Sequence, residues 1–379
     1  VLFRSVNPLV PLRPFRITFI GRYTEGSTGI VRSIFLSLHE LGHAVQEINV
    51  DQDRRLAENP LARFGGNGPI FINWEIIKDS VIGFQPDLIL LCAGGLTFRE
   101  SDLKEIKRHA VVLGVTLSDP DVYPTVSAYS RQFHFHATNS LLALQRYRDA
   151  GHHNVVHLPF GIDSRFFVPR PVHPPFQCDV AVIGHATEER LPLAKRLYKE
   201  FNVMFHGRNW PWRTSGPVHG EDWFRAAYST RFLVNFPRTR SGYTNVKIGI
   251  FEGTATGRLV FTEYFDEMGR YFEYDKEIVG YRDADDLVTK IRYYLDHPDE
   301  AEAIAKAGQL RCAREHTWAN RIASLLEYIH RNQPRLTPWP AAKGRPVFAG
   351  QVSVAVDGRK QKKRKKKEKT KKKRSARKD

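Results

Sequence analysis

The sequence predicts an α/β protein with two parallel, doubly wound sheets that face each other across a cleft. Short apolar runs alternate with amphipathic helical patterns through residues 16–160, and the same alternation starts again at residue 179. Such alternation is typical of parallel sheets with helices on both faces. A segment rich in proline and aromatic residues, 161–178, separates the two series. The predicted fold class is therefore two Rossmann-like domains joined by a linker.

The first domain is predicted over residues 16–160. Its strands are expected at 16–20, 44–50, 87–92, 111–117 and 155–158, and its helices at 30–41, 74–83, 97–108 and 139–150. The apolar residues of 30–41 recur on one helix face. Gly42 is expected to end that helix, because glycine accepts the left-handed conformation of many C-terminal caps. Three glycines of the loop after the first strand are grouped with the candidate site: Gly21, Gly26 and Gly29.

The second domain is predicted over residues 179–317. Its strands are expected at 179–184, 203–207, 232–236 and 259–262, and its helices at 188–201, 245–256, 283–297 and 300–314. A final helix, 318–332, is expected to pack back on the first domain. Ligands of doubly wound sheets bind beyond the carboxyl ends of the strands, so the cleft between the domains is the expected site.

The positive charge of the chain is concentrated at its C-terminal end. Residues 359–379 carry +13 of the total +17, which leaves a nearly balanced body of +4. The pI of 9.8 therefore does not indicate a nucleic-acid-binding fold. Residues 333–379, first proline-containing and then rich in Lys and Arg, are expected to be disordered. The tail is either a solvated extension or an electrostatic tether to an anionic polymer or membrane surface.

The three cysteines, Cys92, Cys178 and Cys312, lie far apart in the sequence. This spacing argues against a disulfide framework and favours a reducing compartment. No apolar run approaches the roughly 20 residues of a spanning helix, and no signal peptide is visible. We therefore expect a cytoplasmic protein, soluble or held at the membrane surface by its tail. Residues 1–15 are interpreted as an extension, of which 1–5 resemble translated vector sequence.

One motif indicates a different function. Residues 39–43 read His-Glu-Leu-Gly-His, which matches the H-E-x-x-H helix of zinc proteases. That chemistry requires both histidines on one helical face. A helix that ends at Gly42 would leave His43 outside, so the structural interpretation is favoured and the zinc protease is kept as an alternative.

Three Asp-x-Asp triplets occur, at 51–53, 119–121 and 283–285. This pattern is short enough to arise by chance, and the last triplet opens a predicted helix, where aspartate caps free N–H groups. No metal and no cofactor is expected.

The segment 245–260, NVKIGIFEGTATGRLV, resembles the C-terminal region of GT-B glycosyltransferases, in particular their bacterial CgeB-like (spore-maturation) branch among the group 1 glycosyl transferases. The shared features are a helix with a Phe-Glu pair, a glycine and a strand of branched residues. The resemblance covers most of residues 16–330 and is strongest over 179–330. It implies a hexosyltransferase-type enzyme whose second domain holds a nucleotide-diphosphate sugar and whose first domain holds the acceptor.

The candidate donor-binding residues lie in the second domain: Arg208, Arg238, Thr244, Asn245, Lys247 and Glu252. A helix that starts near Thr244 and Asn245 would present free N–H groups to a diphosphate, and Lys247 would add a charge. The resemblance implies that Glu252 binds the donor ribose. Arg208 and Arg238 each follow a predicted strand end, which makes them further candidates for the diphosphate.

The sequence departs from the family at one position. Many retaining relatives carry a second glutamate eight residues before the one at Glu252, and here that position is Thr244. The stereochemistry is therefore left open. An inverting enzyme would need a general base in the first domain, for which Glu25 and Asp119 are the candidates. A non-catalytic sugar- or nucleotide-binding protein of spore or envelope assembly is the remaining alternative.

Overall fold

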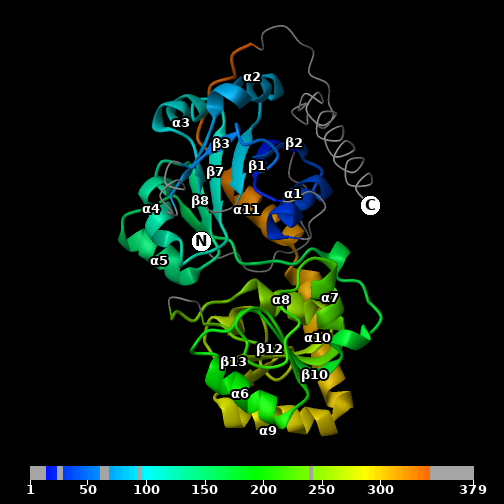
Figure 1. The fold of residues 1–379 in the computed structure, drawn as a ribbon. Coiled ribbons are helices and arrows are strands. Elements are labelled where there is room, and N and C mark those ends of the chain that lie inside the picture. Colours follow the sequence, from blue (N-terminus) through cyan, green and yellow to red (C-terminus); the bar gives the residue numbers. More distant parts are fainter. Residues whose placement is uncertain (1–13, 24–28, 60–67, 93–94, 239–241, 342–379) are drawn as a thin grey trace, which may run out of the picture.

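The computed structural model describes residues 14–23, 29–59, 68–92, 95–238 and 242–341. These residues form two α/β domains, drawn one above the other in Figure 1. The first domain runs from blue to cyan-green, and the second is green to yellow. The strand predicted at the start of each domain is present. The fold class predicted from the sequence is confirmed.

The first domain is built on a parallel sheet with the strand order β2-β1-β5-β7-β8-β9. The strands are β1 (Arg16–Gly21), β2 (Ala44–Asn49), β5 (Leu88–Cys92), β7 (Val111–Thr116), β8 (Phe135–Thr138) and β9 (Val155–His157). A small additional sheet contains β3 (Ala57–Glu58), β4 (Ile70–Ile72) and β6 (Leu96–Thr97). The sequence did not predict β8, because its short run FHAT lacks a continuous apolar stretch.

Helices cover this sheet and close its core. They are α1 (Ile30–Glu40), α2 (Trp74–Phe84), α3 (Glu100–Ile106), α4 (Tyr123–Ser130) and α5 (Leu141–Asp149). The side chain of Ser140 caps α5 by accepting a hydrogen bond from the backbone N–H of Ala143 at 3.3 Å. Strand β5 is buried along its whole length, as its unbroken apolar sequence predicts.

The second domain repeats the same architecture around the strand order β11-β10-β12-β13-β14. The strands are β10 (Cys178–Ile183), β11 (Val203–His206), β12 (Thr230–Asn235), β13 (Leu259–Glu263) and β14 (Val279–Tyr281). The helices are α6 (Leu191–Glu200), α7 (Glu221–Tyr228), α8 (Ile248–Ala255), α9 (Ala284–Asp296) and α10 (Pro298–Glu315). Asp283 caps α9 by accepting from the backbone N–H groups of Asp285 and Asp286, so this Asp-x-Asp triplet has a structural role.

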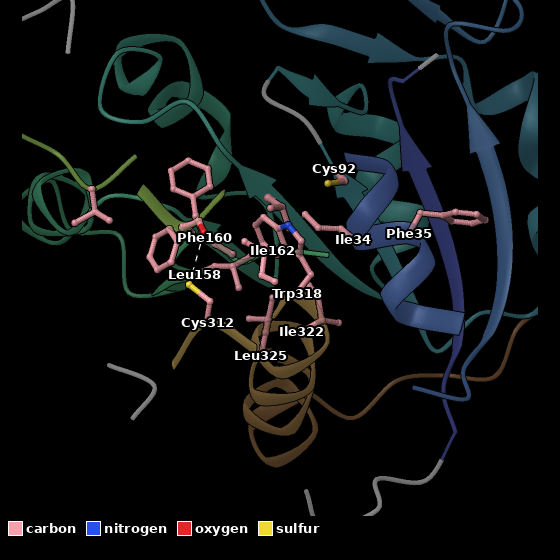
Figure 2. Packing of buried hydrophobic residues seen from close by; sticks show 14 of the residues in the cluster. Ile34, Phe35, Cys92, Leu158, Phe160, Ile162, Cys312, Trp318, Ile322 and Leu325 are labelled. Atoms are coloured by element: carbon pink, nitrogen blue, oxygen red, sulfur yellow. Dashed lines mark hydrogen bonds between the residues drawn. The ribbon is translucent and has the colours of Figure 1, made fainter. Parts of the chain in front are cut away.

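The last described helix, α11 (Trp318–Asn332), returns to the first domain and packs against α1. Figure 2 shows Trp318, Ile322 and Leu325 of this helix beside Ile162 of the linker. These side chains belong to one hydrophobic core that runs from the first domain into the second. The apolar face of α11 therefore stabilises both domains in contact with each other.

The chain crosses between the domains twice, and the two crossings are hydrogen-bonded to each other. Ile162 donates its N–H to the His316 carbonyl at 2.8 Å, and Trp318 donates to the Ile162 carbonyl at 2.8 Å. The buried Arg321 guanidinium donates to the Phe160 carbonyl at 3.2 Å and to His316 Nδ1 at 2.8 Å. Burial lowers the pKa of Arg321 to about 10. This charged side chain thus joins the first crossing to the second.

The H-E-x-x-H motif does not present two histidines on one helix. Helix α1 ends at Glu40, and Gly42 has the left-handed φ of 79° that a glycine cap accepts. His43 lies beyond the helix, where its Nδ1 accepts a hydrogen bond from the Phe15 N–H at 3.1 Å. In the part of the chain that the structure describes, no three His, Cys, Asp or Glu side chains gather as metal ligands. No helix within the same ranges is long and apolar enough to cross a membrane.

Candidate functional site

A cavity of about 150 Å³ lies where the two domains and the linker meet. It is lined by the start of α1, the first crossing, the loop before α7 together with the first turn of that helix, and single residues of α8 and α11: Gly29, Ile30, Ser33, Gly161, Ile162, Asp163, Phe166, Phe167, Val218, His219, Gly220, Trp223, Phe224, Glu252 and Trp318. Helices α1, α7 and α8 follow β1, β11 and β12 in the chain. The cavity therefore lies at the carboxyl ends of both sheets, where doubly wound folds bind ligands.

Glu252 contributes a carboxylate to this cavity. It lies in the second turn of α8, whose neighbouring residues Ile250, Phe251 and Gly253 are buried in the core. Among the described residues, the Glu252 carboxylate has no hydrogen-bond or ion-pair partner. Burial raises its pKa to about 7, because removal from water disfavours the charged form. A ligand that donates hydroxyl groups to Glu252 would offset that cost.

Lys247 lies at the N-cap of α8 and brings a positive charge to the start of this helix. Its Nζ donates to the Phe236 carbonyl at 3.1 Å and also to the Arg238 carbonyl. Burial and the nearby charge of Arg190 lower the pKa of Lys247 to about 8. Lys247 and Glu252 are separated by about 7.5 Å along the helix axis, since each residue rises about 1.5 Å. The helix start thus combines free N–H groups with a partly buried cation.

Arg190 is a site residue that the sequence analysis missed. The apolar pattern placed it inside a helix at 188–201, whereas α6 begins at Leu191 and Arg190 is its N-cap. The guanidinium donates to the His185 carbonyl at 2.7 Å and lies 5.4 Å from the centre of the Phe236 ring. Within the described chain it forms no ion pair. Arg190 and Lys247 therefore lie near each other, with the carboxylates of Asp121 and Glu189 also near Lys247, and neither cation lines the cavity itself. Two neighbouring cations favour a bound anion.

Comparisons with known proteins agree with this geometry. Residues 188–327 match the family model described as glycosyl transferase-like, and this range contains Arg190, Lys247 and Glu252. A glycosyltransferase from Rickettsia africae has a similar structure at 13% sequence identity, covering 84% of this chain and 99% of that one with a TM-score of 0.55. The chain has the GT-B fold, and the family match over its second domain supports a glycosyltransferase.

Two further solved structures share this fold. Sucrose-phosphate synthase from Thermosynechococcus elongatus matches at 12% identity, over 83% of this chain and 98% of its own, with a TM-score of 0.56. HepE from Anabaena, in complex with UDP-glucose, matches at 10% identity, over 83% and 99%, with a TM-score of 0.54. No curated protein matches the sequence significantly.

Arg208 and Arg238 occupy different positions in the second domain. Arg208 is exposed after β11, and its backbone N–H donates to His185 Nδ1 at 2.9 Å, beside the loop that carries Arg190. This approach requires Gly207, because a Cβ there would lie 2.0 Å from the Gly184 carbonyl oxygen. Arg238 instead forms an ion pair with Glu263 at 3.1 Å. Arg208 is thus the more available of the two for a ligand.

The sequence predicted that Thr244 and Asn245 begin the helix. In the structure both residues precede α8. Thr244 is exposed and bridges Arg238 in antiparallel pairing. The Asn245 N–H donates to the Pro237 carbonyl at 3.2 Å. Both residues pair with the opposite arm of the segment, and the helix starts at Ile248, three residues after Asn245.

Of the two candidate bases, Asp119 lies in the described chain and Glu25 does not. Asp119 is 3% exposed, and its Oδ2 accepts a hydrogen bond from the Thr138 hydroxyl at 2.6 Å. Its Oδ1 is buried without a partner, and burial raises its pKa to about 6. The Asp119 carbonyl oxygen accepts from Asn245 Nδ2 at 3.2 Å. The structure therefore brings Asp119 to the domain contact, with its carboxylate enclosed.

Of the three candidate glycines of the first loop, two lie in the described residues. Gly21 is the last residue of β1, and Gly29 is the N-cap of α1 and lines the cavity. Gly26 lies outside the described residues.

Proposed function

We propose that this glycosyltransferase takes its sugar from a nucleoside-diphosphate sugar, most simply a UDP-sugar, and transfers it to an acceptor hydroxyl without a metal. The observation that carries this proposal is the half-buried Glu252 carboxylate, which faces the cavity without a partner in the described chain. The solved complex of HepE with UDP-glucose, which shares the fold, supports this choice of donor.

Each part of the donor has a chemically suited group in the site. The ribose hydroxyls would donate to Glu252. The diphosphate would lie at the start of α8, between Lys247 and Arg190, where charge-assisted hydrogen bonds are strongest. Phe167 and Trp223 line the cavity and offer aromatic faces to the base.

The reaction follows from this placement. The acceptor oxygen would attack the anomeric carbon, its proton would pass to a base, and the bond from that carbon to the diphosphate would break. The departing nucleoside diphosphate would leave with the electron pair, stabilised by Lys247 and Arg190 in a closed cleft. These two cations supply the charge that a metal ion provides in other enzymes. For the base we propose Asp119 or Glu25, and the stereochemistry stays open.

Three finer assignments belong to the same proposal. The chain would belong to the bacterial CgeB-like branch, an assignment that the Phe251-Glu252 helix and Gly257 support. The protein would act in the cytoplasm or at the membrane surface. The basic segment 359–379, outside the described residues, would hold it to an anionic polymer or membrane, near an acceptor that is a glycan, a protein or a wall polymer.

A thermal-shift screen tests the donor assignment. UDP, GDP, TDP and CDP and their sugars would be compared on the wild type, Glu252→Ala and Lys247→Ala. Glu302→Ala, which removes an exposed carboxylate on α10, is the matched control. We expect a selective rise in Tm with a UDP ligand in the wild type and the control, and its loss in both site variants. No rise with any nucleotide in folded protein would contradict the proposal.

The presence of Thr244 at the position of the family's second glutamate favours one alternative, a protein that binds the donor without transferring the sugar. Donor hydrolysis in the absence of acceptor separates the two. We expect slow release of UDP from the wild type, unchanged by a metal chelator. Donor binding with no hydrolysis and no transfer would favour the binding protein.

A further inference from the structure

The segment that joins β12 to α8 carries Lys247 and also contacts the first domain. At the base of this segment, Arg238 pairs with Thr244 in an antiparallel bridge, and Asn245 donates its N–H to the Pro237 carbonyl at 3.2 Å. The second domain thus fixes the two arms of the segment. Tyr243 and Asn245 lie just before Lys247, and each of them contacts the first domain.

The first contact joins Tyr243 to Arg146 of α5. The guanidinium carbon of Arg146 lies 4.5 Å from the centre of the Tyr243 ring and 6.0 Å from the centre of the Tyr123 ring in its own domain. Both distances fall within the range of cation–π attraction. Arg146 is half-buried and forms no ion pair with another described residue. Its charge therefore lies against one aromatic ring from each domain.

The second contact is a buried hydrogen bond. Asn245 is 5% exposed, and its Nδ2 donates to the Asp119 carbonyl oxygen at 3.2 Å. That carbonyl is itself held in place, because Asn139 donates to it at 3.2 Å and accepts from the Asp119 N–H at 3.0 Å. Asn245 is thus fixed to a rigid point of the first domain.

We propose that the first domain positions Lys247 for the donor diphosphate through these two contacts, with Arg146 and the Asp119 carbonyl as positioning groups. The inference rests on the proposed role of Lys247. Asn245 fixes the backbone two residues before Lys247, while the Lys247 ammonium is bound to carbonyls on the opposite arm of the same segment. Docking of the segment and donor binding are therefore linked, and each stabilises the other.

Arg146 offers a test from outside the donor site. UDP-glucose binding would be measured by calorimetric titration for Arg146→Gln, Tyr243→Leu and the double variant. We expect each single change to weaken binding about two- to fivefold, the size of one partly exposed cation–π contact. The double variant should bind no more weakly than the weaker single variant, because both changes remove the same contact. In donor turnover, KM should rise while kcat changes less.

Conservative variants and a matched control separate positioning from general damage. Arg146→Lys and Tyr243→Phe keep the cation and the ring, so their affinities should stay within about twofold of the wild type. Arg148→Gln removes an exposed arginine from the same helix and should change nothing. Additive losses in the double variant, or an equal loss in Arg148→Gln, would overturn the inference.

The outcome also separates this inference from the proposed function. If the wild type binds UDP-glucose, Lys247→Ala does not, and Arg146→Gln binds normally, then only the positioning role is wrong. If neither the wild type nor any variant binds UDP-glucose, the proposed donor is wrong and the positioning role fails with it.

Discussion

Replacement of Glu252 by glutamine should make the ligand-free protein more stable while it weakens donor binding. Burial raises the pKa of Glu252 from 4.5 to about 7. The native state therefore binds the proton more tightly than the unfolded chain, so the contribution of Glu252 to the free energy of unfolding falls as the pH rises from about 4.5 to 7. At about 1.4 kcal/mol per pH unit, a shift from 4.5 to about 7 costs at most about 3.5 kcal/mol at pH 8. Glutamine carries no charge and avoids this cost.

Donor binding should depend on pH in the opposite direction. Ribose hydroxyls donate to the ionised carboxylate, so the affinity for UDP-glucose should be about five- to tenfold lower at pH 6 than at pH 7.5. Above pH 8 the affinity should fall again, because Lys247, with a pKa of about 8, loses its charge. Glu252→Gln should remove the dependence on the acid side and keep the dependence on the alkaline side.

Urea unfolding at pH 6 and pH 8, with and without UDP-glucose, measures both effects. Glu252→Gln should show the higher midpoint at pH 8 without ligand and the smaller gain when ligand is added. Glu302→Ala should behave like the wild type in both conditions. Two results together would refute the argument that Glu252 is a desolvated carboxylate that binds a hydroxyl ligand. The first is a Glu252→Gln variant that is less stable than the wild type at pH 8. The second is a wild-type affinity for UDP-glucose that does not change between pH 6 and 7.5.

Three further predictions concern the diphosphate, the strand-end loops and the crossings. Lys247→Ala should raise the Kd for UDP-glucose by about 10- to 100-fold, the value of a charge-assisted hydrogen bond, and an unchanged Kd in calorimetry would exclude a phosphate contact. Gly207→Ala should destabilise the protein by about 1–3 kcal/mol, because the added Cβ would lie 2.0 Å from the Gly184 carbonyl oxygen. The control Gly83→Ala places its Cβ in open space on α2 and should be neutral or slightly stabilising. Tm measurements compare the two variants. Arg321→Met should cost about 2–3 kcal/mol in urea unfolding, since it leaves two buried acceptors unpaired, and a loss below about 0.5 kcal/mol would mean that Arg321 does not hold the crossings together.

Local patterns predicted most of the helices and strands. The apolar run of β5, the helix end at Gly42 and the cap at Asp283 all depend on neighbouring residues, so the sequence contains the information directly. Strands β8 and β14, the small sheet and helices α4 and α7 were missed. The short strands acquire their geometry from the neighbours with which they pair, which no short sequence window contains.

The candidate site was predicted only in part, and the reason is again physical. Glu252 and Lys247 share one helix and its N-cap, so a motif within one segment could indicate both. Arg190 and Arg146 come from other segments of the chain. Their proximity to Lys247 and to Tyr243, respectively, depends on how the loops and domains meet.

The sequence by itself determined that the chain forms two doubly wound domains, because hydrophobic periodicity and helix caps act over a few residues. It also determined that His43 lies beyond the helix of His39. Only the tertiary structure decided which charges meet at the cleft and which carboxylate stays without a partner. Those properties arise from the packing of distant segments, since burial and Coulomb interactions depend on distance in space rather than on separation along the chain.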